Sequence, residues 1–447
     1  MIDTKSLRKS LLSLAVTGKL TEQSEKDTPL SDDLNEYVPK MDIELPEIPV
    51  NWKYCKFDEV LINRDSERIP VSVADRKKLD KVYDYYGASG VIDKVDSYLF
   101  DDTLLLIGED GANLLSRSTP IAFLAHGKYW VNNHAHVLAS TEHILLEYAE
   151  IVINSMSLVP FVTGAAQPKL SQNMMNKIAI PVPPLEEQQR IVDVVKESFK
   201  ILDTIDEFQM VYLSDVEVLR SKLIDAGIQG KLTEQLPEDG TAEELFAEIQ
   251  AEKQQLIKEK RIKKEKALAD ISEEEIPFEI PNNWKWVRWG ELSQSIQYGY
   301  NAPAKQEGRI KMVRISDIQD GKVLWDTVPY CDIDETEIES YLLHENDILF
   351  ARTGGTVGKS YIVADVPEEA VFAGYLIRTS YSSKLCARYM KYFMESKLYW
   401  RQLQNGTIAT AQPNCNGQTL SKMVLPLPPY AEQVRIVQKL DALLGLI

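Results

Sequence analysis

The sequence predicts a protein of the α+β class, with two mixed α/β globules separated by long antiparallel, coiled-coil-like helices in a circular pseudo-two-fold repeat. Three observations predict this fold. Short motifs recur in the same order in both halves of the 447 residues. A helical stretch of about 40 residues, or about 60 Å at 1.5 Å per residue, lies between the halves. The two chain ends match the two halves of that stretch, so the repeat is circular.

The repeat rests on three collinear motifs. The hexapeptide GKLTEQ at 18–23 recurs at 230–235, an offset of 212. The pattern I-P-x-N-W-K recurs with an offset of 232, and P-x-P-P-x-x-E-Q recurs with an offset of 245. Three matches in the same order are not expected by chance, so the chain is an internal duplication.

The helical parts come next in the argument. An amphipathic helix is expected near the N-terminus, and apolar residues spaced three or four apart predict a long helix from Leu185 to about Asp225, ending near Gly227 or Gly230. The prolines before Leu185 suit a helix start. Residues 181–250 carry −10 of the total charge of −18. DNA would repel this stretch, which therefore suits a protein-facing spacer.

The two globules contain short β-rich runs separated by glycine-containing turns, and each has a helical patch before its last Pro-Pro. Strands are expected at 103–107, 121–124, 130–138, 348–352 and 361–363, and helices at 145–157, 242–270 and 386–403. The predicted division is a helical region (1–44), a first globule (45–184), a long-helix spacer (185–275), a second globule (276–429) and a short C-terminal helix (430–447).

Composition excludes several classes of protein. The longest uncharged apolar run is far shorter than the ~20 residues that span a bilayer. The N-terminus lacks the pattern of a cleaved signal peptide. The four cysteines form no C-x-x-C pair, so a disulfide framework and a zinc site are not indicated and a cytoplasmic location is expected.

Together, the order of helix, globule, long helix, globule and helix and the three repeated motifs resemble the specificity (S) subunit of a type I restriction–modification system. The resemblance covers the whole chain. Within the globules, segments 86–90, 131–136, 314–318 and 348–355 resemble the target-recognition domains of that family. One departure is that the last helix stops at Ile447, earlier than the circular repeat requires.

The resemblance implies a DNA-binding subunit that is not itself an enzyme. Each globule would read one half of a split target in double-stranded DNA. The paired helices would bind two methyltransferase (M) subunits, and restriction (R) subunits would join them. S-adenosylmethionine, ATP and Mg are then expected on the partner subunits and no cofactor or metal in this chain. Two alternatives are an internally duplicated DNA methyltransferase, and a helical scaffold that does not contact DNA.

Several motifs allow a second interpretation. Segment 353–360 imitates a phosphate-binding loop, but the pattern needs glycine at Thr353 and a helix after Lys359, where a strand is expected. Leu427-Pro-Pro-Tyr resembles a methyltransferase motif but lacks the leading Asn or Asp, so it is interpreted as a helix start. Trp52 and Trp284 are interpreted as core anchors and not as base-stacking residues.

Candidate DNA-contacting residues lie in the glycine-rich turns, on one predicted strand edge and on two matching loops. A strand edge with Asn132, Asn133, His134 and His136 could read bases, because Asn pairs with adenine, or could bond within the fold; a metal site at His134 and His136 is disfavoured. The loops at 167–169 and 412–414 are either DNA-facing or plain turns. The DNA-binding candidates are Ser89, Asn132, Asn133, His134, His136, Gln167, Lys169, Arg314, Ser316, Arg352, Thr353, Lys359, Gln412 and Asn414. The partner-binding candidates on the helices are Leu185, Gln188, Arg190, Leu219, Leu223 and Arg435.

Overall fold

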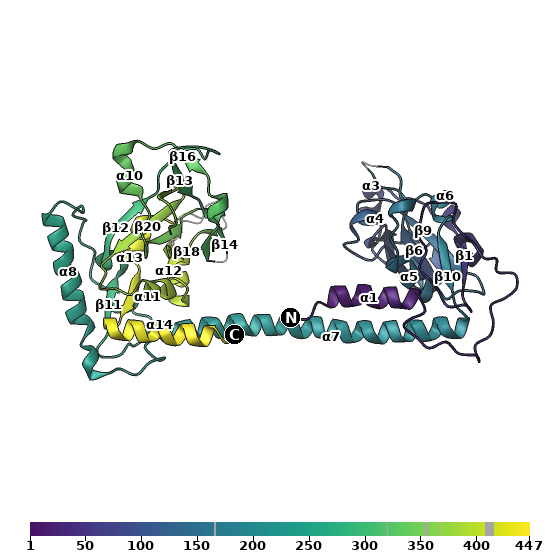
Figure 1. Cartoon of the computed structure of the whole chain (residues 1–447), viewed down its shortest axis with the longest axis horizontal. Coiled ribbons are helices and arrows are strands. Elements are labelled where there is room, and N and C mark those ends of the chain that lie inside the picture. Colours follow the sequence, from purple (N-terminus) through teal and green to yellow (C-terminus); the bar gives the residue numbers. More distant parts are fainter. Residues whose placement is uncertain (165–166, 320, 354–355, 365, 407–414) are drawn as a thin grey trace. The chain divides into compact units, whose positions relative to one another are not determined.

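A computed structural model describes residues 1–447 except 165–166, 320, 354–355, 365 and 407–414. The chain divides into two compact units, unit 1 (Met1–Val211) and unit 2 (Tyr212–Ile447) (Figure 1). The division falls inside the long helix. It does not test the five-segment division expected from the sequence, which stays a prediction.

Unit 1 contains two four-stranded sheets and one two-stranded ribbon. The first sheet has the order β2-β9-β6-β7, the second β4-β3-β8-β5, and β1 pairs antiparallel with β10. The strands are β1 (Lys53–Lys56), β2 (Leu61–Asn63), β3 (Tyr83–Gly87), β4 (Gly90–Val95), β5 (Phe100–Asp101), β6 (Leu104–Gly108), β7 (Ala122–Ala125), β8 (Lys128–Val131), β9 (Ala135–Ser140) and β10 (Ala179–Val182). The helices are α1 (Thr4–Val16), α2 (Phe57–Val60), α3 (Val73–Arg76), α4 (Asn113–Ser116), α5 (Leu146–Ser155) and α6 (Gln172–Met175).

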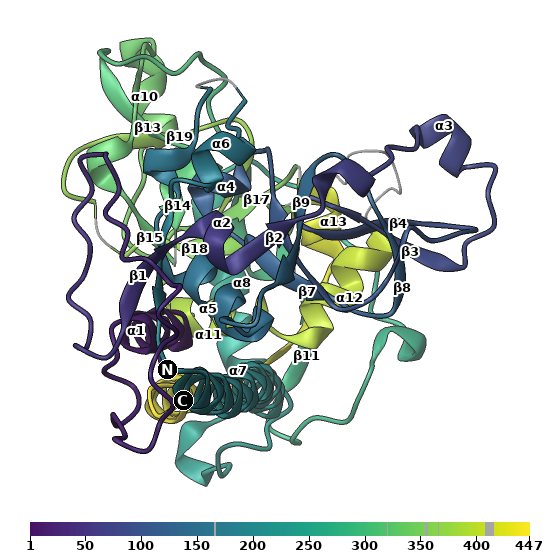
Figure 2. The ribbon, with the colours of Figure 1, turned by 90° about the vertical axis from the view of Figure 1, so that its right-hand side faces the viewer.

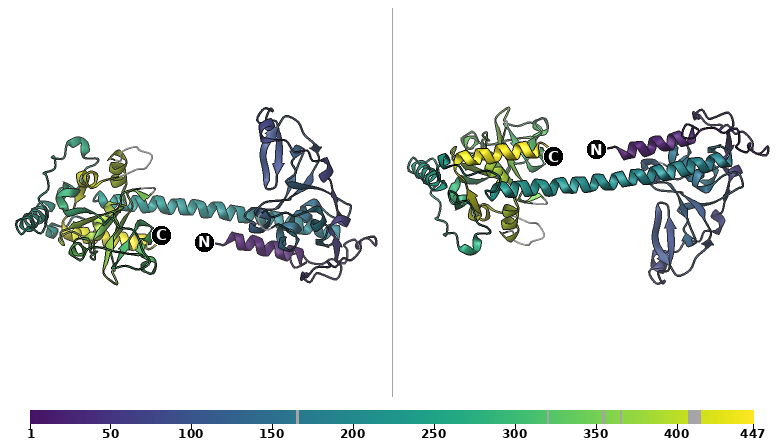
Figure 3. Two further views of the ribbon diagram at one scale, coloured as in Figure 1. Left: turned by 90° about the horizontal axis from the view of Figure 1, so that it is seen from above. Right: turned by 90° about the horizontal axis from the view of Figure 1, so that it is seen from below.

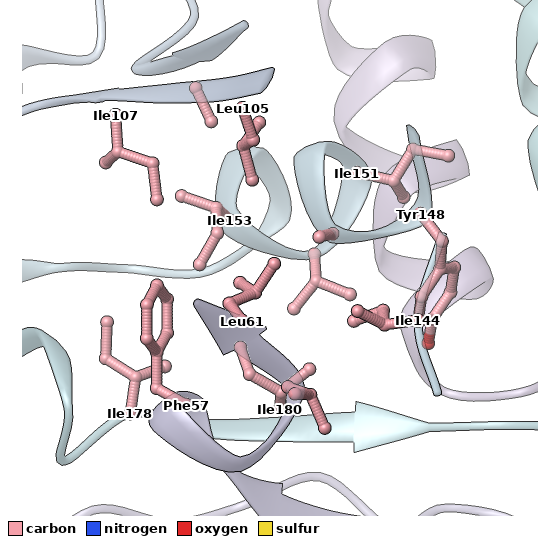
Figure 4. Packing of buried hydrophobic residues seen from close by; sticks show 14 of the residues in the cluster. Phe57, Leu61, Leu105, Ile107, Ile144, Tyr148, Ile151, Ile153, Ile178 and Ile180 are labelled. Carbon is pink, nitrogen blue, oxygen red and sulfur yellow. The ribbon is translucent and has the colours of Figure 1, made fainter. Parts of the chain in front are cut away.

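The core of unit 1 lies between α5, the first sheet and the β1–β10 ribbon (Figure 4). Tyr148 and Ile153 of α5 are fully buried, and Figure 4 shows Ile153 between Leu105 of β6 and Ile180 of β10, with Tyr148 beside Ile144. The strand β6 is buried along its whole length, as its nearly unbroken apolar sequence requires. This packing holds the ends of β2 and β6, where polar side chains gather.

Unit 2 repeats this plan. A four-stranded sheet has the order β12-β20-β17-β18, β13 pairs with β16 and β19, β14 pairs with β15, and β11 pairs antiparallel with β21. The strands are β11 (Lys285–Arg288), β12 (Ser293–Tyr298), β13 (Ile310–Val313), β14 (Ile318–Gln319), β15 (Lys322–Val323), β16 (Tyr330–Cys331), β17 (Ile348–Ala351), β18 (Ser360–Ile362), β19 (Ala370–Phe372), β20 (Leu376–Tyr381) and β21 (Val424–Leu427). The helices are α8 (Ala242–Lys258), α9 (Trp289–Leu292), α10 (Glu335–Tyr341), α11 (Ala387–Phe393), α12 (Lys397–Gly406), α13 (Gly417–Lys422) and α14 (Tyr430–Leu444).

The long helix α7 (Leu185–Ile228) contributes to both units. In unit 1, α1 lies beside its first part (Figure 2) and runs antiparallel to it (Figure 1). Arg8 of α1 forms an ion pair with Asp203 of α7 at 2.8 Å. In unit 2, α14 lies beside its last part, and Gly227 lies against Ile436 and Leu440 (Figure 3). The predicted pairing of each chain end with the long helix is therefore present within each unit.

Three predicted elements have different bounds. The expected strand 130–138 is two strands, because Asn132 Oδ1 accepts the His134 N–H at 2.8 Å and stabilises a turn. The expected helix 386–403 is interrupted at Ser396, whose Oγ accepts the Tyr399 N–H at 3.3 Å and starts α12. The expected helix 242–270 ends at Lys258, two residues before the left-handed Lys260 (φ 59°).

Two further features concern the class of protein. Among the described residues, no helix is both long and apolar enough to span a membrane. All four cysteines are free thiols, and Cys55, Cys331 and Cys415 are buried. Burial raises the pKa of the Cys55 thiol to about 11, so this thiol is a core residue and not a nucleophile.

Candidate nucleic-acid interface

A buried cluster of Trp, Glu and Gln fixes the start of the long helix in unit 1. The Glu187 carboxylate is fully buried and accepts hydrogen bonds from Trp52 Nε1 at 2.9 Å and Gln23 Nε2 at 2.7 Å. Thr21 Oγ1 donates to the same carboxylate at 3.2 Å. The cluster therefore joins all three repeated motifs, because GKLTEQ, I-P-x-N-W-K and P-P-x-x-E-Q each supply a residue.

Unit 2 contains the same cluster with almost the same distances. Glu432 is fully buried and accepts from Trp284 Nε1 at 2.8 Å, Gln235 Nε2 at 2.8 Å and Thr233 Oγ1 at 3.0 Å. We call these two sets the Trp–Glu–Gln clusters. The tryptophans are anchors of the frame, as interpreted from the sequence. Each of the two carboxylates receives N–H and O–H donors, which compensates its burial.

Three residues expected to bind partner subunits instead bind within the chain. Gln188 is fully buried, where its side chain accepts the Leu145 N–H at 2.8 Å and donates to Pro183 O at 2.9 Å. Arg190 forms a bidentate ion pair with Asp27, and Arg435 forms the matching pair with Asp239. The side chains of these repeated motifs bond within their own unit because they hold the start of a helix.

The other helix candidates are placed differently from one another. Leu185 and Leu219 are exposed, so both are accessible to another protein. Leu223 is partly buried against the core of unit 2.

In unit 1, several sequence-predicted residues gather around the end of β6 and the loop 109–111 that follows it. His134 Nδ1 lies 2.7 Å from Asp110 Oδ2, and the backbone of Lys169 forms an isolated antiparallel β-bridge with Asp110. Gly108 lies against the carbonyl of Ala88, where a Cβ would approach the oxygen to 2.6 Å. Exposed side chains of this group that could contact DNA are Ser89, Asn133, His134, Gln167 and Lys169.

A network of opposite charges lies beneath this surface. Arg68 Nη1 donates to Glu109 at 2.7 Å and Arg68 Nη2 lies 3.3 Å from Asp65, while Lys169 Nζ lies 3.0 Å from Glu109. Burial by itself would raise the pKa of Glu109, but hydrogen bonds from Arg68 and Lys169 outweigh it and lower that pKa. Burial by itself would also raise the pKa of Asp65, but hydrogen bonds, chiefly the one with His136, outweigh burial and lower that pKa.

His136 belongs to this network and not to a DNA-facing edge. The side chain is almost fully buried, with Nδ1 2.6 Å from Asp65 Oδ2 and Nε2 2.7 Å from the carbonyl oxygen of Leu170. Asn132 is also buried, and its Oδ1 accepts the His134 N–H. For both residues the structure places the side chain in the hydrogen-bonded interior, the alternative that the sequence left open. His134 and His136 do not share a face, because His134 lies in the turn before β9.

Unit 2 has an arginine where unit 1 has Glu109. Ile107 pairs with His136, and Phe350 pairs with Ile377 in the matching sheet. Glu109 follows Ile107 of β6 by two residues, and Arg352 follows Phe350 of β17 by two residues. Glu109 and Arg352 therefore occupy matching positions. In the neighbouring strands, Asn63 pairs with Leu138, and Ile296 pairs with Thr379 at the equivalent place in unit 2. Asp65 and Tyr298 each follow two residues later, so they also occupy matching positions.

The Arg352 guanidinium is held over an aromatic ring. Its Cζ lies 4.7 Å from the ring centroid of Tyr298, and Nη1 donates weakly to Gly374 O at 3.4 Å. Its buried Nε has no hydrogen-bond partner among the described residues. A planar fork with unused donors suits guanine O6 and N7 or a phosphate, and the ring limits the orientations it can adopt.

The other candidates of unit 2 differ in how much of each side chain is accessible. The half-exposed Arg314 forms a bidentate ion pair with the buried Asp317, so part of its fork is already used. Ser316 and Lys359 are exposed, and Thr353 is partly buried. Gln412 and Asn414 lie outside the described residues.

Two chemical alternatives can be compared with the structure. The strand β18 follows Lys359, as expected, where a phosphate-binding loop would require a helix. Potential metal-ligating atoms of Asp65, Glu109 and His136 lie within 4.8 Å of one another. The Arg68 guanidinium already binds both carboxylates, so this group forms an ion-pair network.

Comparison with known proteins decides the family. The sequence model described as "Type I restriction modification DNA specificity domain" matches residues 49–208 and 281–447, one copy in each half. The chain belongs to this family. Among its relatives, the EcoAI specificity subunit of Escherichia coli is 25% identical over 63% of this chain and 56% of its own length. The EcoEI specificity subunit of Escherichia coli is 23% identical over 98% of this chain and 88% of its own length.

A solved structure shares the fold of this chain. It has a TM-score of 0.62 and 15% identity, covering 90% of this chain and 92% of that one, and its title concerns complex assembly and conformational transition of the type I restriction–modification system. The two specificity-domain matches each include the buried glutamate of a Trp–Glu–Gln cluster, Glu187 at the start of α7 or Glu432 at the start of α14.

Sequence reasoning missed the partners of the predicted residues. Arg68, Asp65 and Glu109 were not singled out, and neither was Tyr298. No local motif signals them, because each contacts residues far along the chain. The buried roles of Glu187 and Glu432 had a signal, since both follow the repeated Pro-Pro.

Proposed function

We propose that this chain is the DNA-reading subunit of a type I restriction–modification complex, with each unit reading one half of a split target in double-stranded DNA. One observation carries the proposal. Two specificity-domain matches coincide with two copies of one frame, and the matched strand ends carry different polar groups, Glu109 and Arg352. Phosphate contacts would supply affinity, and base edges would supply specificity.

The partners in this proposal are two methyltransferase subunits and the restriction subunits. Support comes from the exposed apolar side chains of α7, which include Phe208 and Met210 in unit 1 and Tyr212 and Leu219 in unit 2. Large exposed apolar side chains along a helix suit contact with another protein. Leu185, also exposed, is part of the proposed surface.

The chain itself would be non-catalytic. We infer that S-adenosylmethionine, ATP and Mg act on the partner subunits, and that the complex works in the cytoplasm. The Pro-Pro-Tyr segment at 428–430 starts α14 and carries no amide or carboxylate before the prolines, which supports a structural role. The four free cysteines are compatible with a reducing compartment.

A domain exchange tests the proposal. Residues 45–184 are replaced by the equivalent globule of a relative with a known target, and the methylated sites of cells that carry the complex are sequenced. One half-site should change completely while the other is retained. The reciprocal exchange of 276–429 serves as the matched control and should change the opposite half-site. A chimaera that alters both half-sites would contradict the assignment of one reader to each unit.

A further inference from the structure

A strongly basic segment follows α8 in unit 2 and has no counterpart in the first repeat. Residues 258–266 contain six basic and two acidic residues, a net charge of +4 in a chain whose total is −18. The segment belongs to the roughly 20 residues that separate the repeat offsets of 212 and 232. It is therefore an addition to the frame that both units share.

The basic side chains of this segment are accessible. Lys258, Lys260, Lys263, Lys264 and Lys266 are all exposed, and none of them forms an ion pair within the part of the chain that the structure describes. Arg261 has a weak partner, Glu259, at 4.0 Å. The charges are thus free to bind an external anion.

Both ends of the segment are anchored to unit 2. On the N-terminal side, Lys253 Nζ of α8 donates to Gly290 O at 2.8 Å, and Gln250 Nε2 donates to Glu291 O at 3.0 Å. On the C-terminal side, Arg288 donates to the carbonyls of Ala269 at 2.7 Å and Asp270 at 3.0 Å. The segment is consequently an exposed loop on a fixed base, which reduces the entropy lost when it binds.

The same base is joined through α13 to Tyr298, the ring under Arg352. Arg288 Nη1 also donates to Lys422 O at 2.8 Å, at the last residue of α13. At the other end of α13, the Gly417 N–H donates to Tyr298 Oη at 3.1 Å, under the Arg352 guanidinium. A helix of six residues spans about 9 Å, or about three base pairs along a duplex at 3.4 Å each.

We propose that segment 258–266 binds the DNA phosphate backbone beside the half-site that unit 2 reads, without contacting base edges. The inference rests on the proposed function and extends it, because the additional contacts would belong to the second reader alone. The lysines are point charges on flexible stems, which suit phosphate contacts and not bidentate base recognition. The alternative ligand is an acidic surface of a partner protein.

The test uses the full-length chain assembled with its methyltransferase subunits. Lys258, Lys263, Lys264 and Lys266 are all changed to Gln, and binding to a duplex with the target and to a random duplex is measured from low to physiological salt. The slope of log K against log salt should become less steep by about 0.9 for each phosphate that the variant no longer neutralises. The decrease in affinity should be equal on both duplexes.

Two matched variants sharpen this measurement. Changing the same four positions to Arg keeps the charge and should keep the salt dependence. Changing Lys9 on α1, Lys439 on α14 and Lys231 just after α7 to Gln removes charge from exposed positions outside the segment and should leave the slope almost unchanged.

The remaining outcomes overturn the proposal. An unchanged salt slope does so, whether or not the yield of the assembled complex falls; a reduced yield would assign the segment to a partner protein. A loss confined to the target duplex would assign it to base reading. If the unmodified complex showed no preference for any target, the proposed function itself would fail, independently of this segment.

Discussion

The two units share one frame and differ at the ends of matching strands. In unit 1, Trp52 donates to Glu187 at 2.9 Å, and in unit 2 Trp284 donates to Glu432 at 2.8 Å. Beyond the matching strands β6 and β17, unit 1 has Glu109 and unit 2 has Arg352. The Trp–Glu–Gln clusters are thus kept where the sequence repeats. The polar side chains differ at the strand ends, where the chain can vary without disturbing the helix starts.

A second comparison concerns the helices that pack on the frame. Glu147 of α5 pairs with Lys196 at 3.6 Å, whereas the equivalent Arg388 of α11 pairs with Asp441 at 2.7 Å. The ion pair occupies the same place with the charges reversed. Tyr148 and Tyr389 set this alignment, because their hydroxyls donate to the equivalent carbonyls of Pro181 and Pro426. Reversed charges disfavour the pairing of either helix with the wrong partner.

The largest effect is expected at the Trp–Glu–Gln clusters. Glu187→Gln should destabilise unit 1 by about 3 kcal/mol, because the new amide places a donor opposite the existing donors in a buried site. Glu432→Gln should destabilise unit 2 by a similar amount. Hydrogen exchange measured for each unit separately would show the loss of protection. Equal clusters require equal losses, so a large effect in one unit and none in the other would contradict the shared frame.

A smaller effect is expected at the strand ends. Arg352→Ala should weaken binding to the target by about 1–3 kcal/mol if the guanidinium reads a base. Arg309, an exposed arginine that pairs with Glu335, offers a matched control, and Arg309→Ala should change target binding little. Binding of both variants to target and random duplexes is compared. An equal loss on both duplexes for Arg352→Ala would assign this residue to a phosphate.

The smallest effect concerns Glu150 of α5, whose equivalent in unit 2 is Lys391. Burial, reinforced by nearby Glu147 and opposed by Lys196, raises the pKa of Glu150 to about 7 from 4.5. The folded state therefore keeps the proton between these values while the unfolded chain loses it, and stability falls as the pH rises from 4.5 to 7.

Glu150→Gln should accordingly stabilise unit 1 by about 1 kcal/mol above pH 7, with partial solvation limiting the gain, and should have little effect below pH 4.5. Lys391→Gln is the matched change, because Lys391 forms an ion pair with Glu395. It should slightly destabilise unit 2 at pH 8, where this ion pair is present. Thermal unfolding at pH 4 and pH 8 measures both variants, and a gain for Glu150→Gln at low pH would contradict the assigned protonation.

The sequence by itself determined the duplication, the long helix, the strands β6, β7, β17 and β18 and the family resemblance. These depend on short motifs and local periodicity, which are readable along the chain: α7 (Leu185–Ile228) follows its apolar spacing and its prolines, and the tryptophans were correctly interpreted as anchors. The turn at Asn132 and the end of α8 at Lys258 were not predicted, because the turn depends on one side-chain bond and the helix end on one left-handed residue.

Only the tertiary structure decided which polar side chains stay accessible. The sequence left His136 and Asn132 open between base reading and bonding within the fold, and the structure places His136 in the interior beside Asp65, 71 residues earlier, and Leu170, 34 residues later. Arg190 and Arg435 looked available to partners until Asp27 and Asp239 were placed beside them. A sequence pattern specifies which face of an element is apolar. It does not specify which distant charge arrives to satisfy a polar group, because those contacts form only when the strands and loops pack together.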